Sequence, residues 1–288
     1  MLKCTQTSPA RQGAFKRQGY TRGRVTNVYF ELTEAFNASA PTVALASGQA
    51  VVFYRVAIMS KDGDWVIRES PEACERVLAV LESRGARYRP SSPLDVRWLS
   101  GGWSSHFEFF DDRRRRIRCD FVSRPPRVST VSVEALFVGH RQSRLVTVGV
   151  ESLIRMKHTQ RAKDYAVIGP LAALLPPERE IALSTDPDRV LALAPRFGTD
   201  VTRPAVRAGL SGDRRAVVLA LAVEADDLQQ RDRRRVERYE AAAVPYLEAC
   251  RALRVGDLPL RAAHTCMCEA AERHLPPRVA GGADADAE

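Results

Sequence analysis

Strand-like and helix-like segments are segregated along this chain, and their order limits the folds that it can adopt. Short apolar runs bounded by turn residues alternate with helical patterns as far as residue 175. After Pro176 and Pro177 the strand patterns stop, and three helical patterns follow at 216–228, 236–253 and 260–274. This order predicts the α+β class, with a small mixed sheet and flanking helices followed by a helical C-terminal region.

Apolar periodicity predicts the individual elements of the first part of the chain. Strands are expected at 43–46, 64–68, 103–110, 117–122 and 146–150. Helices are expected at 28–37, from Ala50, at 71–85, at 151–158 and at 165–175. The two apolar runs at 103–110 and 117–122 flank a short stretch of aspartates and arginines, which predicts a hairpin with a charged tip.

The two ends of the chain differ in composition from the rest and set the expected domain boundaries. Residues 1–30 are polar, basic and without apolar periodicity, which predicts a flexible N-terminus. Residues 280–288 are small and acidic and are expected to form a disordered tail. A mixed core at 31–175 and a helical region at 176–279 are expected between them.

The net charge and the cysteines indicate which partners and which cellular compartment are expected. The chain has 44 basic and 35 acidic residues, a net charge of +9, which favours polyanionic partners such as RNA, DNA or a nucleoside triphosphate. Arginine also serves simply to keep a surface soluble, so the charge alone does not select a partner. No apolar run approaches the roughly 20 residues of a membrane span. The six irregularly spaced cysteines favour reduced thiols in a cytoplasmic protein that has no membrane partner.

A phosphate-binding turn is predicted at the end of the first apolar run. Residues 43–46 run into Ser47 and Gly48, and a short helical pattern follows. Small residues at the start of a helix expose backbone N–H groups, and these groups form a seat for phosphate.

Three aspartates are the candidate metal ligands. Thirteen residues separate Gly48 from Asp62, which is followed by Asp64 at i+2, and Asp120 lies inside a later apolar run. Carboxylates at i and i+2 on a strand project from the same face. A third carboxylate on a neighbouring strand completes an oxygen-rich site that suits Mg²⁺ and can bind triphosphate oxygens.

The order of these segments resembles the nucleotidyltransferase-like superfamily, whose signature is an apolar strand, a small-residue pair, Asp-x-Asp and a distant third Asp. The similarity extends to 151–157 and 161–164, which resemble the helical segment that many bacterial members carry after the third carboxylate. It covers about residues 40–175 and is strongest with the nucleotidyltransferases of toxin–antitoxin and abortive-infection systems. Two departures are that Ser-Gly replaces the usual Gly-Gly or Gly-Ser, and that Gly63 replaces an apolar residue between the carboxylates.

The resemblance implies a nucleotidyltransferase-like core at 31–175 with a small mixed sheet of that type. It implies an enzyme that moves a nucleoside monophosphate from an NTP such as ATP to an acceptor hydroxyl. The acceptor would be an RNA end such as that of tRNA, a protein side chain or a small molecule, and a cognate antitoxin is an implied partner. The implied metal ligands for Mg²⁺ or Mn²⁺, which are also the catalytic residues, are Asp62, Asp64 and Asp120. The implied nucleotide contacts are Ser47, Gly48 and Lys157.

Each site residue also has a structural interpretation. The sequence around Asp62 and Asp64 suits a tight turn as well as a metal site. A salt bridge from Arg116 or Arg118, at i−4 and i−2 on the same strand face, would explain Asp120 without a cation. The alternative function is a catalytically inactive module of the same fold that binds an NTP or a protein.

Overall fold

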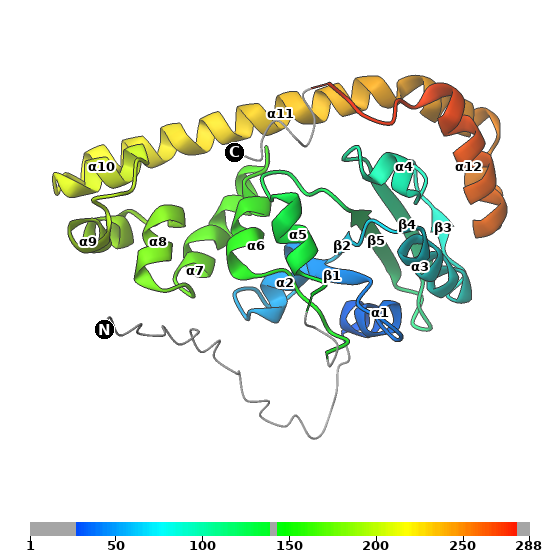
Figure 1. The fold of residues 1–288 in the computed structure, drawn as a ribbon, viewed down its shortest axis with the longest axis horizontal. Coiled ribbons are helices and arrows are strands. Elements are labelled where there is room, and N and C mark those ends of the chain that lie inside the picture. The colour runs from blue at the N-terminus through cyan, green and yellow to red at the C-terminus, as the bar shows by residue number, and fades with distance from the viewer. Residues whose placement is uncertain (1–26, 139–142, 281–288) are drawn as a thin grey trace, which may run out of the picture.

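The structure is a computed structural model that describes residues 27–138 and 143–280. The predicted flexible N-terminus (1–30) lies outside the described residues except for its last four, and the predicted tail (280–288) except for Ala280. The fold is α+β, as predicted: a five-stranded mixed sheet with flanking helices is followed by a helical C-terminal region (Figure 1).

The sheet has the strand order β1-β2-β5-β4-β3, in which only β2 and β5 pair in parallel. The strands are β1 (Val43–Ala46), β2 (Gly63–Ile67), β3 (Arg87–Tyr88), β4 (Ser104–Phe110) and β5 (Arg116–Val122). The predicted β4–β5 hairpin is confirmed, with register from Ser104 opposite Val122 to Phe110 opposite Arg116. The strand predicted at 146–150 is wrong, because only a single parallel bridge joins Thr147 to Leu45.

The two faces of the sheet differ in polarity because successive side chains alternate along each strand. One face carries the main core, in which Trp65 stacks on Phe121 with ring centroids 5.2 Å apart and Phe107 meets Phe121 edge-on. The opposite face carries Asp64, Asp120 and His106, which are neighbours across β2, β5 and β4. The candidate site therefore lies on the polar face.

Helices cover both faces of the sheet. On the main core side, α1 (Val28–Phe36), α3 (Pro71–Ser83) and α12 (Leu260–His274) contribute the buried apolar side chains. A second core joins the apolar residues of the polar face to α2 (Ser47–Phe53), α6 (Val150–Lys157) and α7 (Ile168–Ala172). Four further short helices are α4 (Val96–Leu99), α5 (Thr130–Ala135), η1 (Ala162–Val167) and η2 (Val255–Asp257).

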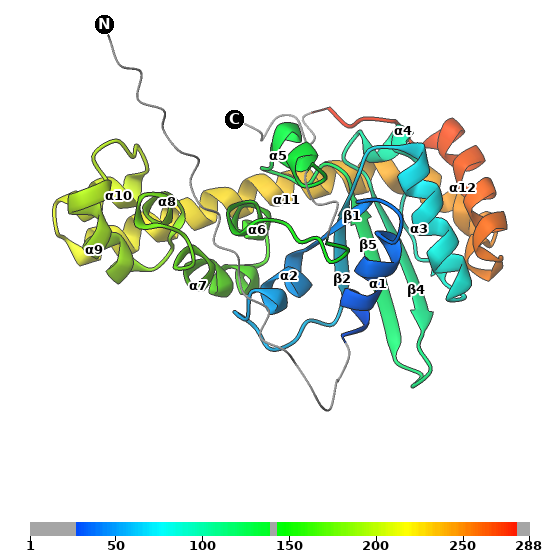
Figure 2. The same ribbon diagram turned by 60° about the horizontal axis from the view of Figure 1, so that its bottom comes forward.

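The C-terminal region is helical, as predicted, but the two helices expected at 216–228 and 236–253 are a single 39-residue helix, α11 (Arg214–Ala252). The segment 229–235 is polar on every side, so it carries no apolar periodicity, yet it contains no glycine or proline that would break a helix. α11 runs the length of the molecule, with α10 (Pro204–Leu210) and α9 (Pro187–Phe197) at one end and α12 at the other (Figures 1 and 2). α8 (Pro177–Leu183) completes the first of these ends.

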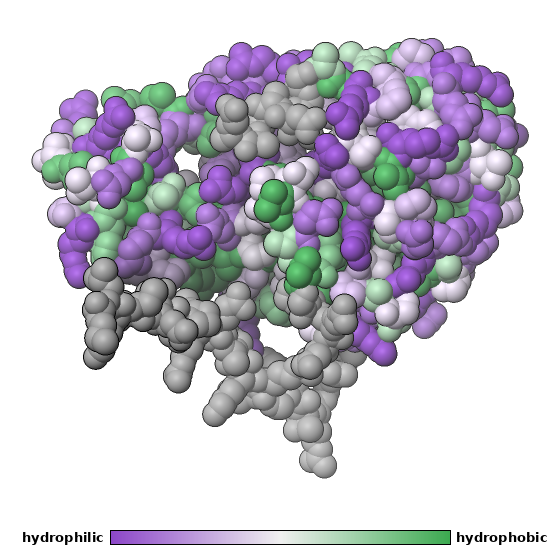
Figure 3. Space-filling view, viewed as in Figure 1, coloured by the Kyte–Doolittle hydropathy of each residue, from purple (hydrophilic) through white to green (hydrophobic). Residues whose placement is uncertain are grey.

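The described surface is mixed in character. Hydrophilic residues cover much of the face shown in Figure 3, and apolar residues form small groups between them. None of the described helices is both long and apolar enough to cross a bilayer. Five cysteines form no disulfide with one another, and Cys4 lies outside the described residues.

Candidate functional site

Asp64 and Asp120 lie side by side on the polar face of the sheet. They are Cα partners in the parallel pairing of β2 with β5, so their side chains leave adjacent strands on the same face. Asp62 precedes β2 by one residue, and its side chain is 44% exposed. The structure thus brings two of the three predicted ligands into direct register and places the third at the edge of the site.

Burial and mutual repulsion make these carboxylates hard to ionise. Burial, and then the negative charge of Asp120, raise the pKa of Asp64 to about 7 despite the opposing charge of Lys157. Burial likewise raises the pKa of Asp120 to about 6, although Arg89 opposes the shift. A pair of this kind attracts a cation, because a bound positive charge would remove both penalties.

The salt-bridge partner predicted for Asp120 was wrong. Arg89 directly follows β3, and its Nη1 donates to Oδ1 of Asp120 at 3.0 Å. The side chain can reach Asp120 because β4 alone separates β3 from β5 in the sheet. Arg118 instead lies 3.6 Å from Asp62, and its buried Nε has no hydrogen-bond partner among the described residues. Arg116 is an exposed residue at the start of β5.

The donor chemistry at Asp64 and Asp120 fits a hard divalent cation. In the described part of the chain, no three Asp, Glu, His or Cys side chains form a group that could hold a metal ion on their own. Mg²⁺ in nucleotide sites is usually held by one or two carboxylates together with substrate phosphates, so a ready three-residue cage is not required. A cation at this pair would have to replace Arg89 as the partner of Asp120.

The predicted phosphate seat begins the helix rather than preceding it. α2 starts at Ser47, whose φ of 46° is in the left-handed region that few residues other than glycine adopt. At Gly48 an added Cβ would lie 2.2 Å from Oγ of Ser60, so a side chain there would push the loop before β2 away. Ser47 thus has a left-handed backbone and Gly48 packs closely against Ser60. The turn directly follows Ala46, which pairs with Asp64 in the sheet.

Lys157 is buried rather than solvated. Its side chain is only 8% exposed, and Nζ donates to Oγ of Ser47 at 3.3 Å and to Oδ1 of Asp164 at 3.5 Å. Its charge also acts on Asp64, where it lowers the pKa against the larger effect of burial. The structure thus joins Lys157 to the Ser47 turn, and its ion-pair partner is Asp164.

The close packing around position 63 explains why this residue, which departs from the superfamily pattern, is a glycine. The rings of Tyr29 and Trp65 would lie 2.4 and 2.5 Å from a Cβ added at this position. The residue between the two aspartates is therefore buried under two aromatic rings. Any side chain at this position would displace the rings and, with them, the start of β2.

Two residues next to the site were not predicted from the sequence. Arg89 has no local signal, since its partner Asp120 lies 31 residues away. His106 is the second of these residues: it lies opposite Asp120 on β4, and its Nε2 is 3.0 Å from Oγ of Ser104. Burial, and then the charge of Arg89, lower the pKa of His106 to about 4, so this imidazole is neutral near pH 7.

Asp64→Asn is expected to stabilise the metal-free protein at high pH only. An acid whose pKa is raised by folding holds its proton more tightly in the native state, so ionisation costs stability as the pH rises from about 4 to about 7. Asparagine avoids that cost, so we expect a Tm increase of about 5 °C at pH 8 and almost none at pH 4.

Thermal unfolding in EDTA at both pH values measures this difference. Asp112→Asn, in the exposed hairpin tip, is the control and should leave Tm unchanged at both pH values. An Asp64→Asn effect of the same size at pH 4 and pH 8 would contradict the raised pKa of Asp64.

Comparison with known proteins gives no family for this chain. No protein-family profile matches the sequence, and a search of curated proteins found no match. Among solved structures, JHP933 of Helicobacter pylori is 13% identical with a TM-score of 0.36, over 74% of this chain and 94% of that one. A second structure, an H. pylori protein provisionally named a nucleotidyltransferase, is 14% identical with a TM-score of 0.37, over 72% of this chain and 94% of that one. Similarities this distant leave the geometry of the site as the basis for its function.

Proposed function

We propose that this chain is a metal-dependent nucleotidyltransferase that moves a nucleoside monophosphate from an NTP to an acceptor hydroxyl. One observation carries the proposal: Asp64 and Asp120 stand in parallel register next to a Ser47 turn that the buried Lys157 reaches. This places paired carboxylates, a small-residue turn and a desolvated cation in one place. These are the groups that binding a metal–triphosphate complex requires.

The proposed roles follow from position and charge. Asp64 and Asp120 would hold Mg²⁺ or Mn²⁺ together with triphosphate oxygens, and Asp62 would contribute from the edge. The bound cation would neutralise charge that develops on the phosphates during transfer. Lys157, with Ser47 and Gly48, would contact the phosphates.

Asp120 would also accept the proton of the acceptor hydroxyl. In the metal-free protein burial raises the pKa of this carboxyl to about 6, so it is still largely ionised at pH 7. Asp120 would take this role only after Arg89 has been displaced, because a carboxylate paired with a guanidinium is a poorer base.

Incubation with each labelled NTP, Mg²⁺ and either total RNA or total protein tests this function directly. We expect label in one macromolecular fraction. The excess of basic residues favours RNA, with tRNA as the first acceptor to test, and a toxin of this kind would be inhibited by a cognate antitoxin. Label in protein, or in an added small molecule, would select another acceptor, and no labelled product from any NTP would contradict an active enzyme.

An NTP with Mg²⁺ is expected to raise the Tm of the wild-type chain by about 5 °C when its concentration is roughly a hundred times Kd. Lys157→Met should remove most of this shift, because it deletes the cation next to Ser47. Lys163→Met, an exposed lysine in η1, removes the same charge outside the site and should keep the shift. Equal shifts in all three proteins would rule out Lys157 as a nucleotide contact.

The second candidate function is an NTP-binding module without turnover. Two ion pairs favour it, since Arg89 and Arg118 partner Asp120 and Asp62. This alternative predicts an NTP-dependent Tm shift with no labelled product. It also predicts that Asp120→Asn lowers stability, because the partner of Arg89 is lost.

A further inference from the structure

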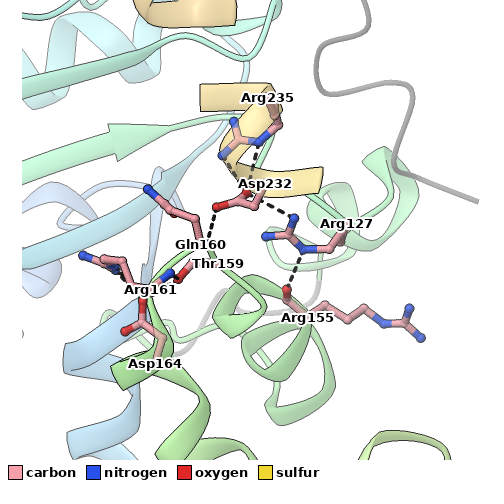
Figure 4. A network of polar contacts seen from close by, with 8 residues as sticks. All are labelled: Arg127, Arg155, Thr159, Gln160, Arg161, Asp164, Asp232 and Arg235. Carbon is pink, nitrogen blue, oxygen red and sulfur yellow. Dashed lines mark hydrogen bonds and ion pairs between the residues drawn. The ribbon is translucent and has the colours of Figure 1, made fainter. Parts of the chain in front are cut away.

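A buried carboxylate in the middle of α11 is tied to the loop that follows α6. The Asp232 residue is 1% exposed, and its Oδ2 accepts a hydrogen bond from the backbone N–H of Gln160 at 2.8 Å. Its Oδ1 accepts from Nη1 of Arg127 at 3.2 Å and from Nη2 of Arg235 at 3.1 Å (Figure 4). A buried carboxylate is tolerated only with partners of this kind, so the whole group forms one connected unit.

The loop held by Asp232 leads directly into the proposed nucleotide contacts. Gln160 lies between Lys157, at the end of α6, and Asp164, in η1. Oδ2 of Asp164 accepts from Oγ1 of Thr159 at 2.7 Å and from Nε of Arg161 at 2.8 Å. Residues 158–161 have no regular hydrogen-bonded structure of their own, so their position depends on these side-chain anchors at Asp232 and Asp164.

A second connection runs from Asp232 to the last turn of α6. Besides its bond to Asp232, Arg127 donates from Nε to the backbone carbonyl of Arg155 at 3.1 Å. That carbonyl also accepts from the backbone N–H of His158 at 3.3 Å, so Arg127 adds a second donor at the point where α6 ends. The same carboxylate therefore fixes the end of α6 through Arg127 and the loop after it through Gln160.

We propose that Asp232 is a positioning residue that fixes residues 155–161 from α11, so that Lys157 stands next to Ser47. Lys157 Nζ lies 3.3 Å from Oγ of Ser47, which leaves little room for movement of the loop. The link to nucleotide binding rests on the proposed function, whereas the link between Asp232 and the loop does not.

The test compares Asp232→Asn with a matched control. Asparagine can still accept the bond from Gln160 but no longer balances two guanidinium groups. The control is Glu180→Gln on α8, since Glu180 is also a buried carboxylate, 2% exposed, and is held by Arg189 through two bonds of 2.6 Å. Both variants remove the charge of a buried carboxylate that is paired with arginine, but only Asp232 contacts the loop after α6.

Two measurements on the full chain separate positioning from general stability. Amide hydrogen exchange without nucleotide should be about tenfold faster at 158–165 in Asp232→Asn and unchanged there in Glu180→Gln. Binding of a fluorescent NTP analogue with Mg²⁺ should weaken by about tenfold in Asp232→Asn, in the range seen when a supporting partner of a binding group is removed. The control should bind as the wild type does.

Three outcomes would overturn the proposal: unchanged exchange at 158–165 in Asp232→Asn, equal acceleration of exchange throughout both variants, or faster loop exchange with unaltered NTP affinity. If the wild type binds no NTP, the proposed function fails, but the exchange data still decide whether Asp232 fixes the loop. If Asp232→Asn does not fold, Arg235→Gln removes one of the two cations and should give a smaller local change in the same segment.

Discussion

Asp64→Asn is expected to reduce nucleotidyl transfer by roughly 10³-fold or more while the protein stays folded. The change keeps the size of the side chain and removes a negative charge from the centre of the proposed metal site. Asp120→Asn should be nearly as severe, and the double variant little worse than either single one, because the two carboxylates serve one cation. Initial rates with saturating NTP and Mg²⁺ measure the loss.

A control substitution at an exposed aspartate and two contradicting results complete this test. Asp200→Asn changes an exposed aspartate in the loop between α9 and α10 and should leave the rate unaltered. A variant pair at positions 64 and 120 that keeps more than about a tenth of the wild-type rate would remove the metal role. Loss of stability with Asp64→Asn would favour a structural role, since the raised pKa of Asp64 predicts the opposite.

Trp65→Ala, one residue along the same strand, is expected to cost about 3–5 kcal/mol of unfolding free energy. Trp65 is fully buried, stacks on Phe121 and meets Phe36 edge-on with centroids 5.5 Å apart. Its Nε1 also donates to Oγ1 of Thr33 at 2.8 Å, and this bond would be lost. Urea unfolding followed by circular dichroism measures the change.

Trp65→Phe provides the graded comparison. It keeps an aromatic ring next to Phe121 but loses the bond to Thr33, so its cost should be smaller, at about 1–2 kcal/mol. A cost below about 1 kcal/mol for Trp65→Ala would show that β2 is not central to the core. Together with Asp64→Asn, these variants separate activity from stability at adjacent positions on one strand.

The sequence predicted the parts of the site that lie on periodic elements. Asp64 and Asp120 are each followed by an apolar residue in a strand-like run, so both the strands and the polar face could be predicted. The β4–β5 hairpin followed from its charged tip between two apolar runs. Local patterns of this kind depend on neighbouring residues alone and are therefore readable in a single sequence.

The parts that could not be predicted depend on which distant elements meet. Arg89 reaches Asp120 only because the short strand β3 adds to the sheet next to β4, and β3 is too short to have a pattern of its own. Asp232 lies in the all-polar stretch that concealed the continuity of α11, so nothing nearby marked it as buried. The contact of Arg89 with Asp120 and the burial of Asp232 are both properties of the tertiary fold.

The continuity of α11 has a consequence for how this chain folds during synthesis. Tyr239 and Tyr246 of α11, and Met267 of α12, belong to the same core as Phe107 and Phe121 of the sheet. These C-terminal side chains leave the ribosome more than a hundred residues after β5 is complete. Until α11 and α12 have been synthesised, the apolar side chains of the sheet that they cover are exposed. We expect the nascent chain to be most prone to aggregation, and to need chaperones most, during this interval.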